Sequence, residues 1–271
     1  MEHYSRHLRI EALLDKLHTA YPQGADGWQL APVDQLHTGG IQASLRLRER
    51  LQRLGSRRIL DIGSGSGGLM RLLTELPGLH VTGLDLCHDF NRLNRGLAGI
   101  HRQAPEPALT TADARALPFA DQSFDALVMQ HSLLNMPDSE AVLRESLRVL
   151  QSGGHLLLHE LVQGPSPKPL LYPVPWADSD RDSHLENTAA LHQLLSSIGF
   201  EVLASLDLSA DALAWRRRQQ AKENDDSRIA KAPASPRWIL GAEFPRRADN
   251  LMHNLADGRI AVIELLARRP R

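Results

Sequence analysis

Residues 59–68 read Ile-Leu-Asp-Ile-Gly-Ser-Gly-Ser-Gly-Gly, which joins a short apolar run directly to a glycine-rich turn. The apolar run predicts a buried strand, and the leucines after the turn predict a helix over 68–76. Glycine lets the backbone adopt positive φ and approach a ligand closely. The spacing Gly63-x-Gly65-x-x-Gly68 also fits the fingerprint of dinucleotide-binding turns, so the stretch predicts a cofactor site without naming the cofactor.

Strands and helices alternate along the chain around this turn. Helices are predicted over 89–99, 139–150 and 187–198, and the last of them ends at Gly199. Such alternation is typical of crossover units, in which helices cover a parallel sheet. Strands are predicted over 58–62, 80–85, 108–112, 124–130, 155–159, 200–207 and 259–268.

Other segments lie outside this alternation. The N-terminal part predicts amphipathic helices over 3–20 and 41–54, joined by a loop over 21–40. Residues 162–185 contain five prolines and show no helical period. Residues 209–258 begin with a polar helix over 209–223 and continue into a Lys/Pro/Ser-rich loop over 224–237. Long connections in compact domains are commonly lids, so we expect these segments to cover a site.

The whole chain is therefore expected to form one domain with recognisable parts. These are a helical cap (1–56), a cofactor-binding core (57–160), a lid loop (161–186) and the remaining sheet (187–271), interrupted by an insertion (209–258).

The charge, the cysteine count and the lengths of the apolar runs limit the classes of function that we expect. The chain has 271 residues, with 31 Lys and Arg against 32 Asp and Glu, so it lacks the basic excess of a nucleic-acid-binding protein. Its single cysteine, Cys87, excludes an internal disulfide framework or a cysteine-rich zinc site. No apolar run is long enough to span a bilayer, and the charged first residues hold no signal-like apolar stretch. We expect a cytoplasmic protein with neither a nucleic-acid nor a membrane partner.

Acidic residues follow three successive strands. Asp61 lies at the end of the first strand, and Asp85 ends the second, where a carboxylate can accept from both hydroxyls of a ribose. Asp113 follows the third strand and could accept from an adenine amine, while the Ala114 amide donates to a ring nitrogen. A lone acidic residue at a strand end is often only a helix cap. Three at successive carboxyl ends share one explanation, because ligands of open parallel sheets bind outside those ends.

With these motifs, the chain resembles class I S-adenosylmethionine-dependent methyltransferases, and within them the small-molecule subfamily that includes sarcosine/dimethylglycine methyltransferases. Residues 58–160 carry the core of the resemblance. Outside it, Asp-Gln-Leu-His-Thr-Gly-Gly at 34–40, the stretches 173–177 and 196–202, and the closing Arg269-Pro270 are also similar to that subfamily. The resemblance implies a Rossmann-like α/β fold with helices on both faces of a seven-stranded, mostly parallel sheet. Its last strand, 259–268, would run antiparallel between 155–159 and 200–207.

The resemblance further implies S-adenosyl-L-methionine as cofactor and a small-molecule acceptor, with an amine or amino-acid-like metabolite expected first. An O-, S- or C-methyltransferase of a secondary metabolite and a non-catalytic cofactor-binding module are alternatives. An NAD-type oxidoreductase fits less well, because two helices precede the glycine turn here. A nucleic-acid methyltransferase is disfavoured by the neutral charge and by the lack of an Asn/Asp-Pro-Pro-Tyr-type sequence after the fourth strand. The expected cofactor contacts are Asp61, Gly63, Ser64, Gly65, Gly67, Asp85, Leu86, Asp113, Ala114, Gln130 and Gln35.

Four residues are candidates for handling the acceptor. His37 could act as general base or bind the methionine carboxylate of the cofactor. Glu160 could accept a proton or pair with a cationic substrate, or be a surface carboxylate. Related enzymes often carry a histidine where this chain has Asn135, which could orient the substrate. His131 would lie beside the cofactor or pack behind it, and His159 is expected on the strand face opposite Glu160.

The remaining features give weaker evidence about function. His3 and His7 share a helical spacing but no further ligand lies at a helpful distance in the sequence, so no metal is expected. The arginines at 216–218 form a solvated face, or one of them reaches a carboxylate substrate. The oligomeric state is expected to be monomer or homodimer. Four tryptophans in the segments outside the core could hold a methylated ammonium or simply pack: Trp28, Trp176, Trp215 and Trp238.

Overall fold

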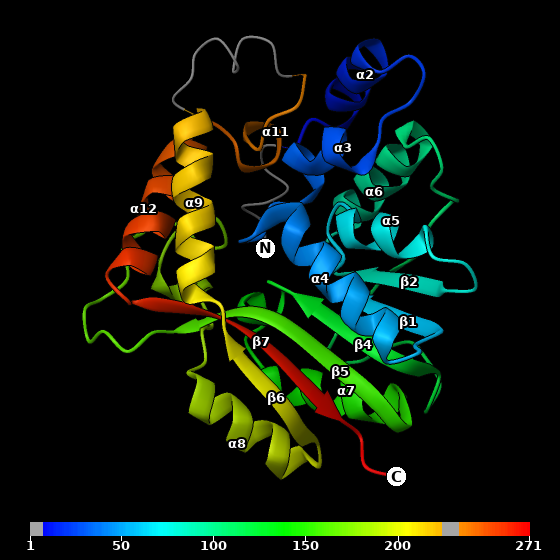
Figure 1. Cartoon of the computed structure of the whole chain (residues 1–271), viewed down its shortest axis with the longest axis vertical. Helices are drawn as coiled ribbons and strands as arrows, with labels where there is room; N and C mark the ends of the chain where they lie inside the picture. The colour runs from blue at the N-terminus through cyan, green and yellow to red at the C-terminus, as the bar shows by residue number, and fades with distance from the viewer. Residues whose placement is uncertain (1–7, 224–232) are drawn as a thin grey trace.

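A computed structural model describes residues 8–223 and 233–271 and shows one seven-stranded sheet (Figure 1). The strand order is β3-β2-β1-β4-β5-β7-β6. The pairs from β3 through β5 are parallel, and β7 runs antiparallel between β5 and β6, which confirms the expected topology. The strands are β1 (Arg58–Ile62), β2 (His80–Asp85), β3 (Ala108–Thr111), β4 (Phe124–Gln130), β5 (Leu150–Gln163), β6 (Glu201–Asp207) and β7 (Ile260–Arg268).

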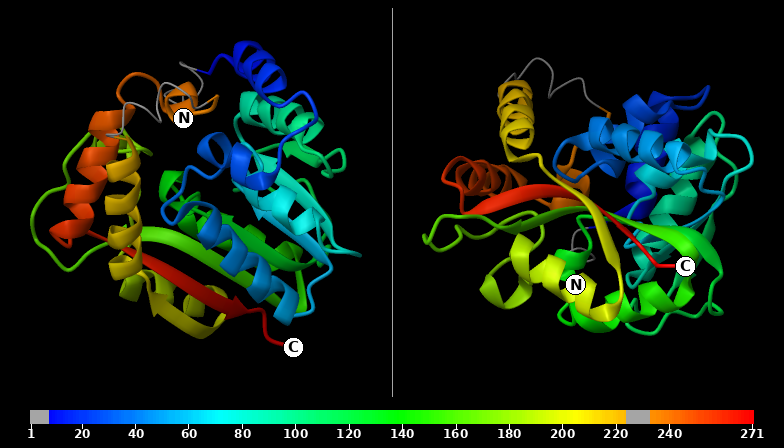
Figure 2. Two further views of the ribbon diagram at one scale, coloured as in Figure 1. Left: turned by 45° about the horizontal axis from the view of Figure 1, so that its top comes forward. Right: turned by 60° about the horizontal axis from the view of Figure 1, so that its bottom comes forward.

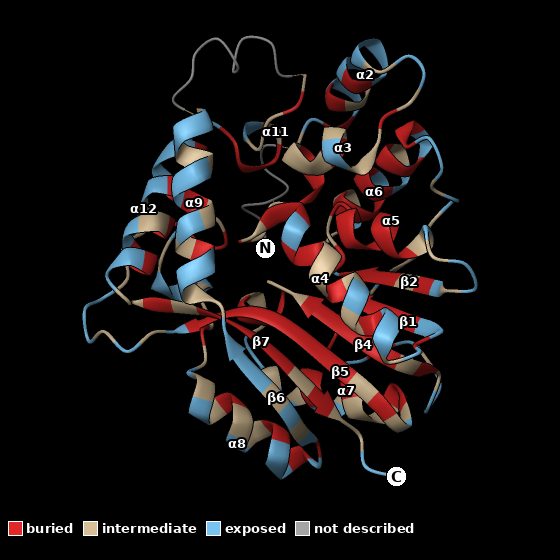
Figure 3. Cartoon of the chain, in the orientation of Figure 1, coloured by how far each residue is buried: buried red, intermediate tan, exposed pale blue. Residues whose placement is uncertain are grey.

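Helices cover both faces of this sheet (Figure 2). Alternate residues of the central strands face opposite layers: Leu127 packs towards α7 and α8, and Val128 packs towards α4 and α5. The central strands are therefore buried on both faces, as Figure 3 shows for β4 and β5. The helices are α2 (Ile10–Ala20), α3 (Gly27–Asp34), α4 (Gly40–Arg53), α5 (Gly68–Thr74), α6 (His88–Ile100), α7 (Ser139–Val149), α8 (Thr188–Ile198), α9 (Ser209–Glu223), α11 (Arg237–Leu240) and α12 (Phe244–Ala256), with short 3₁₀ turns η1 (Leu133–Asn135) and η2 (Asp180–Asp182). In the described part of the chain, no helix has both the length and the apolar character needed to cross a membrane.

The structure corrects the sequence-based prediction at three places. The expected loop over 21–40 contains α3, which begins with a capping box between Asp26 and Gln29 and tolerates Pro32. The expected insertion holds a second long helix, α12, whose buried side includes Phe244 and Leu251. β5 is also much longer than the predicted strand over 155–159.

The insertion reaches across the top of the molecule. α9 and α12 pack together beyond the start of β7, on the side away from α2 and α3 (Figures 1 and 2). The short helix α11 instead belongs to one apolar cluster with α2, α3 and α6, to which it contributes Ile239 and Leu240. The insertion therefore packs partly on itself, through α9 and α12, and partly on the N-terminal helices, through α11.

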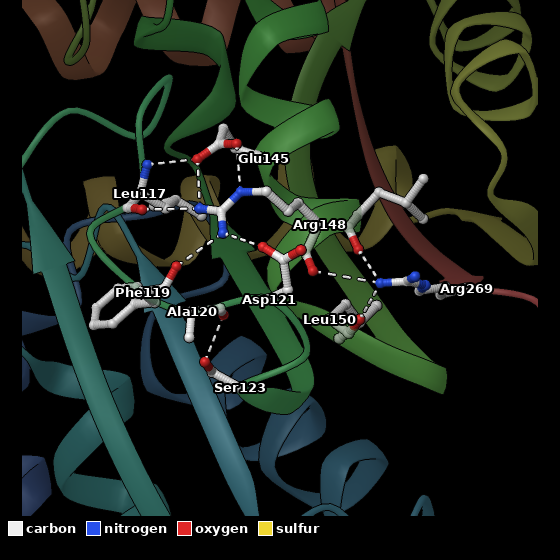
Figure 4. Close-up of polar contacts among 10 residues, drawn as sticks. Leu117, Phe119, Ala120, Asp121, Ser123, Glu145, Arg148, Leu150 and Arg269 are labelled. Atoms are coloured by element: carbon white, nitrogen blue, oxygen red, sulfur yellow. Dashed lines mark hydrogen bonds and ion pairs between the residues drawn. The ribbon is translucent and has the colours of Figure 1, made fainter.

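Arg148 of α7 fixes the connection between β3 and β4 (Figure 4). Its guanidinium donates to the carbonyls of Leu117 and Phe119 at 2.9 and 2.8 Å and to Asp121 at 2.7 Å. Glu145, one turn earlier, accepts from the Leu117 amide at 2.8 Å and also pairs with Arg148. These bonds attach the segment that begins at Asp113 to the helix layer below the sheet.

Candidate functional site

A cavity of about 470 Å³ opens at the carboxyl ends of β1, β2 and β4, a volume that suits a cofactor-sized ligand. Most of the predicted site residues line it, including the three aspartates. Gly67, Gln35 and Glu160 do not line it. The predicted residues in the lining are His37, Asp61, Gly63, Ser64, Gly65, Asp85, Leu86, Asp113, Ala114, Gln130, His131 and Asn135.

The glycine-rich turn has two kinds of glycine. Gly65 has φ +52° and open space where a side chain would begin, so its backbone faces the cavity without obstruction. Gly67, with φ +81°, would place a Cβ 2.0 Å from the Asn94 side chain on α6. Gly67 is therefore needed for close packing between the turn and α6, which explains why it does not line the cavity.

Asp85 holds the turn as well as facing the cavity. Its Oδ2 accepts from the Gly65 amide at 2.9 Å, and its Oδ1 accepts from the Cys87 amide at 2.8 Å. Burial raises the pKa of Asp85, against the lowering effect of these two bonds. Burial raises the pKa of neighbouring Asp61 to about 7, and the Asp85 charge adds to the rise.

Asp113 is already paired at the third strand end. Arg115 donates to it through its guanidinium, at 2.6 Å for the shortest contact, and through its backbone amide at 2.9 Å. These bonds lower the pKa of Asp113. The Asp113 carboxylate is thus ionised and oriented at the cavity edge, beside the predicted partner Ala114.

Three histidine rings gather at the inner end of the cavity. The His37 and His131 centroids lie 5.9 Å apart, and both rings line the cavity. His159 lies behind them, edge-on to His37 at 6.2 Å and stacked on His131 at 5.2 Å. Residues 159 and 160 do face opposite sides of β5, and the His159 side is the one that supports the cavity.

His37 has a defined hydrogen position. Its Nε2 lies 3.0 Å from the Gly40 carbonyl oxygen, which can only accept, so Nε2 carries the hydrogen. Burial lowers the pKa of His37 to about 3, helped by the nearby His159 ring. At neutral pH the ring is therefore uncharged, and Nδ1 keeps a free lone pair.

His131 occupies a strained backbone position. Its φ of +52° is in the left-handed region, which side-chain-bearing residues rarely adopt. Its amide donates to the His159 carbonyl at 2.8 Å, and its own carbonyl accepts from the Asn135 side chain at 3.4 Å. Among the described residues its ring makes no hydrogen bond, and Nε2 is fully buried. Burial lowers the pKa of His131, followed by the effects of His159 and His37.

Glu160 is a buried structural group, neither a surface carboxylate nor a cavity residue. Its Oε1 accepts from the amides of Ser132 and Leu133, both at 2.9 Å, beneath the turn that follows β4. Burial raises its pKa to about 7. Glu160 does not line the cavity, and its Oε2 is buried with no partner among the described residues.

Sequence reasoning missed Ser44, a buried polar residue on α4. Its hydroxyl donates to Gln35 Oε1 at 2.6 Å and lies 3.3 Å from His37 Nε2 and 3.2 Å from Gln130 Oε1. Gln35 thus supports the site from behind, and the buried Gln130 Nε2 has no partner among the described residues. The signal was present, because Ser44 lies within the buried stripe Ile41, Leu47 and Leu51 of α4.

Both long segments contribute residues to the cavity lining. Trp176, Arg181 and His184 contribute from residues 162–185, and Leu240 contributes from the insertion. Trp176 is the one tryptophan in the cavity lining, and its indole donates to Ser183 at 2.9 Å.

The remaining predicted contacts lie elsewhere. Trp28 is exposed, Trp215 lies against Gly40, and Trp238 lies beneath Lys16. Arg216 is buried and paired with Glu223, and neither it nor the next two arginines lines the cavity. No three His, Cys, Asp or Glu side chains of the described ranges are arranged to hold a metal ion, and the pair at 3 and 7 lies outside those ranges.

Comparison with known proteins agrees with this geometry. Residues 60–158 match the family model described as a methyltransferase domain. The chain is 32% identical over 130 residues to the methyltransferase GfsG of Streptomyces halstedii, covering 48% of this chain and 47% of that protein. It is 32% identical over 176 residues to the sarcosine/dimethylglycine N-methyltransferase of Halorhodospira halochloris, covering 61% of each. The chain thus spans about half to three fifths of the length of these relatives.

One solved structure shares the fold along nearly the whole chain. It is the structure described as a sarcosine dimethylglycine methyltransferase of Galdieria sulphuraria, with a TM-score of 0.69 and 20% sequence identity. The match covers 94% of this chain and 97% of that one. The shared fold therefore includes the cap and the insertion as well as the sheet.

Proposed function

We propose that this protein, whose residues 60–158 are a methyltransferase domain with the class I fold, transfers the methyl group of S-adenosylmethionine to a small molecule. The observation that carries the proposal is the cavity, in which a glycine turn and three aspartates lie at successive strand ends. The cap, the 161–186 segment and the 209–258 insertion would cover the acceptor, and residues 57–160 would bind the cofactor.

The residues present fit this cofactor. The Ser64 hydroxyl is buried without a partner in the described part of the chain, and Gly65 leaves its side of the turn open. We assign the glycine turn and Ser64 to the methionine end, Asp85 to the ribose, and Asp113 with the Ala114 amide to the adenine. When bound, S-adenosylmethionine would supply an electrophilic methyl group. The protein itself orients the acceptor and excludes water.

His37 would remove the proton from the acceptor. The Gly40 carbonyl fixes hydrogen on Nε2, so the neutral ring has only a lone pair to offer through Nδ1. A lone pair can accept a proton but cannot donate to a methionine carboxylate. Of the two roles that the sequence left open, the tautomer supports the general base.

The proposed acceptor is an amine or an amino-acid-like metabolite. Similarity to a sarcosine/dimethylglycine N-methyltransferase over 61% of both chains supports this class. The low-polarity surroundings that keep His37 and His131 neutral would also favour a neutral, nucleophilic amine over its ammonium form. Relatives at similar identity include the C-methyltransferase UbiE of Paracoccus denitrificans and the O-methyltransferase resE of Aspergillus sclerotiorum, so carbon and oxygen acceptors are the competing class.

The test is a methyl-transfer screen with isotopically labelled S-adenosylmethionine. The panel contains glycine, sarcosine, dimethylglycine, a primary alkylamine, a catechol and a quinol, with mass spectrometry of the products. Transfer to one of the nitrogen compounds is the expected result. Transfer to the catechol or quinol alone would move the assignment to an oxygen or carbon acceptor. Absence of cofactor binding by calorimetry would overturn the methyltransferase proposal itself.

A further inference from the structure

Two successive residues of β5 hold the turn that carries His131. The His159 carbonyl accepts from the His131 amide at 2.8 Å, and the Glu160 carboxyl accepts from the next two amides at 2.9 Å. The first bond comes from the backbone of β5 and the other two from the Glu160 side chain, so main chain and side chain hold the turn together. Strained backbone persists only where its surroundings impose it, and these bonds supply that constraint at His131.

The His159 ring also reaches the N-terminal cap. Its Nε2 donates to the carbonyl of Thr38 at 3.1 Å, across 121 residues of sequence. Thr38 directly follows His37, so this bond anchors the segment that presents the His37 ring. The ring face meanwhile stacks on His131 with an interplanar angle of 17°. The His159 side chain is 1% exposed and does not line the cavity, so it cannot touch a ligand there.

We propose that His159 is a positioning residue that places two cavity-facing imidazoles at once. The N–H bond to Thr38 sets the position of His37, and the ring stack sets the position of His131. The inference rests on the proposed function for its catalytic meaning, but its geometry can be tested without any acceptor.

The two contacts can be separated by substitution. His159→Phe keeps a flat ring against His131 and loses the donor to Thr38. His159→Gln keeps an N–H donor of similar reach and loses the ring. The matched control is His155→Phe, a half-buried histidine on the same face of β5 that does not line the cavity.

The first readout is NMR of the free protein with labelled histidine rings, over pH 5 to 8. Besides the neutral His37 and His131 rings, the charged groups that face His159 are Arg46 on α4 and its cross-strand neighbour Glu264 on β7, which is paired with Arg50. None of these is altered in the variants. We expect His159→Phe to shift the His37 signals and mix its tautomers while leaving His131 in place. His159→Gln should instead shift the His131 signals and leave those of His37 in place. The control His155→Phe should change neither set of signals.

The second readout is turnover with whichever acceptor the screen identifies, per site titrated with S-adenosylhomocysteine. Both His159 variants should lose about 10-fold in kcat, with the S-adenosylhomocysteine affinity within 2-fold of the parent. A fall in melting temperature with unchanged His37 and His131 signals and unchanged kcat would overturn the proposal and leave His159 a packing residue. Failure of the parent to bind S-adenosylhomocysteine would count against the proposed function, while the NMR result would still decide the positioning role.

Discussion

One backbone contact determines which nitrogen of His37 carries the hydrogen. The Gly40 carbonyl places the hydrogen on Nε2, and burial holds the pKa of the ring at about 3. Between pH 6 and 8 the ring therefore stays neutral, and its own titration cannot produce a pH-dependent rate in that range. Any rise of the rate with pH there would come from deprotonation of the acceptor.

His37→Ala should lower turnover by about 100-fold, the usual cost of a lost general base. The affinity for S-adenosylhomocysteine should stay within about 2-fold, since the base acts on the acceptor. His18→Ala, an exposed histidine on α2, is the control. Steady-state kinetics and calorimetry on the same samples check this prediction. Full turnover in His37→Ala would mean that orientation and exclusion of water suffice for catalysis.

Asp85 is predicted to be the strongest single contact with the cofactor. Asp85→Ala should weaken S-adenosylhomocysteine binding by about 2–3 kcal/mol, because two charge-assisted hydrogen bonds to the ribose are lost. That corresponds to roughly 30- to 150-fold in Kd by calorimetry. The substitution also removes the hydrogen bond from the Gly65 amide, which should weaken binding further. Asp89→Ala removes a nearby carboxylate that pairs with Arg92 on α6, and it should change the Kd little.

Glu160 should make stability depend on pH in a definite direction. Its pKa is raised from 4.5 to about 7 in the folded protein, so folding favours the protonated form. This contribution is fully present below pH 4.5 and is lost as the pH rises through about 7. Glu160→Gln keeps an oxygen for the Ser132 and Leu133 amides and cannot ionise. As the pH rises from 4 to 8, the unfolding free energy of Glu160→Gln should therefore increase by about 3 kcal/mol relative to that of the parent.

Urea unfolding at four pH values measures that difference. Glu140→Gln, an exposed carboxylate on α7, serves as the control for the effect of the substitution type. A constant difference between Glu160→Gln and the parent across the pH range would show that Glu160 has the same pKa in the folded and the unfolded protein, so that burial does not raise it.

Among the helices and strands, the hydrophobic pattern predicted the bounds best for strands that are buried on both faces. The bounds of β1, β2 and β4 agree with the prediction because these strands are apolar on both faces and end at polar turns. α3 escaped prediction because Gly27 and Pro32 suggest a loop, whereas the capping box and contacts with α4 and α5 make it helical. α12 escaped because charged residues interrupt its apolar side, and one of them, Arg247, is buried.

In the candidate site, too, local motifs were predictable and contacts between distant segments were not. Strand-end aspartates and the glycine turn were predictable, because local motifs place them at the cavity. The roles of His159 and Ser44 depend on register and on packing between distant segments, which no local pattern contains. The amide partners of Glu160 could not be predicted for the same reason, since the residue alone does not show which amides it accepts from.

Arg247 of α12 connects the insertion to the segment around Trp176, which lines the cavity. Its guanidinium donates to the Val174 carbonyl at 2.6 Å and to Asp178, on either side of Trp176 in the cavity lining. Arg247→Ala should cost about 1–3 kcal/mol in stability through the lost bonds to the Val174 carbonyl and Asp178. Amide exchange over 172–178 should become faster, measured by mass spectrometry with and without S-adenosylhomocysteine.

The neighbouring Arg246→Ala removes an exposed arginine that lies 3.7 Å from Glu243, and it should leave the exchange over 172–178 unchanged. Equal exchange in the two variants would show that the 172–178 turn is held by its own packing around Trp176 and not by α12.

For the whole molecule, the cavity joins parts that are distant in the chain. Its lining runs from Asp34 in the cap, through the strand ends of the sheet, to Leu240 in the insertion. A ligand that contacts all of these would stabilise the native state as a unit, because it binds the folded chain and not the unfolded one. The size of that effect reports on the identity of the ligand without requiring an acceptor.

S-adenosylhomocysteine at about 100 times its Kd should add about 2.7 kcal/mol to the unfolding free energy. For a chain of this size that predicts a rise in melting temperature of about 5–10 °C. NADH at the same concentration should give no rise, because the glycine spacing and Asp85 suit a nicotinamide cofactor but the Asp113 segment does not. Asp85→Ala should need a correspondingly higher S-adenosylhomocysteine concentration for the same shift. A rise with NADH that equals or exceeds the one with S-adenosylhomocysteine would reassign the cavity to a dinucleotide, and the three aspartates would then need another explanation.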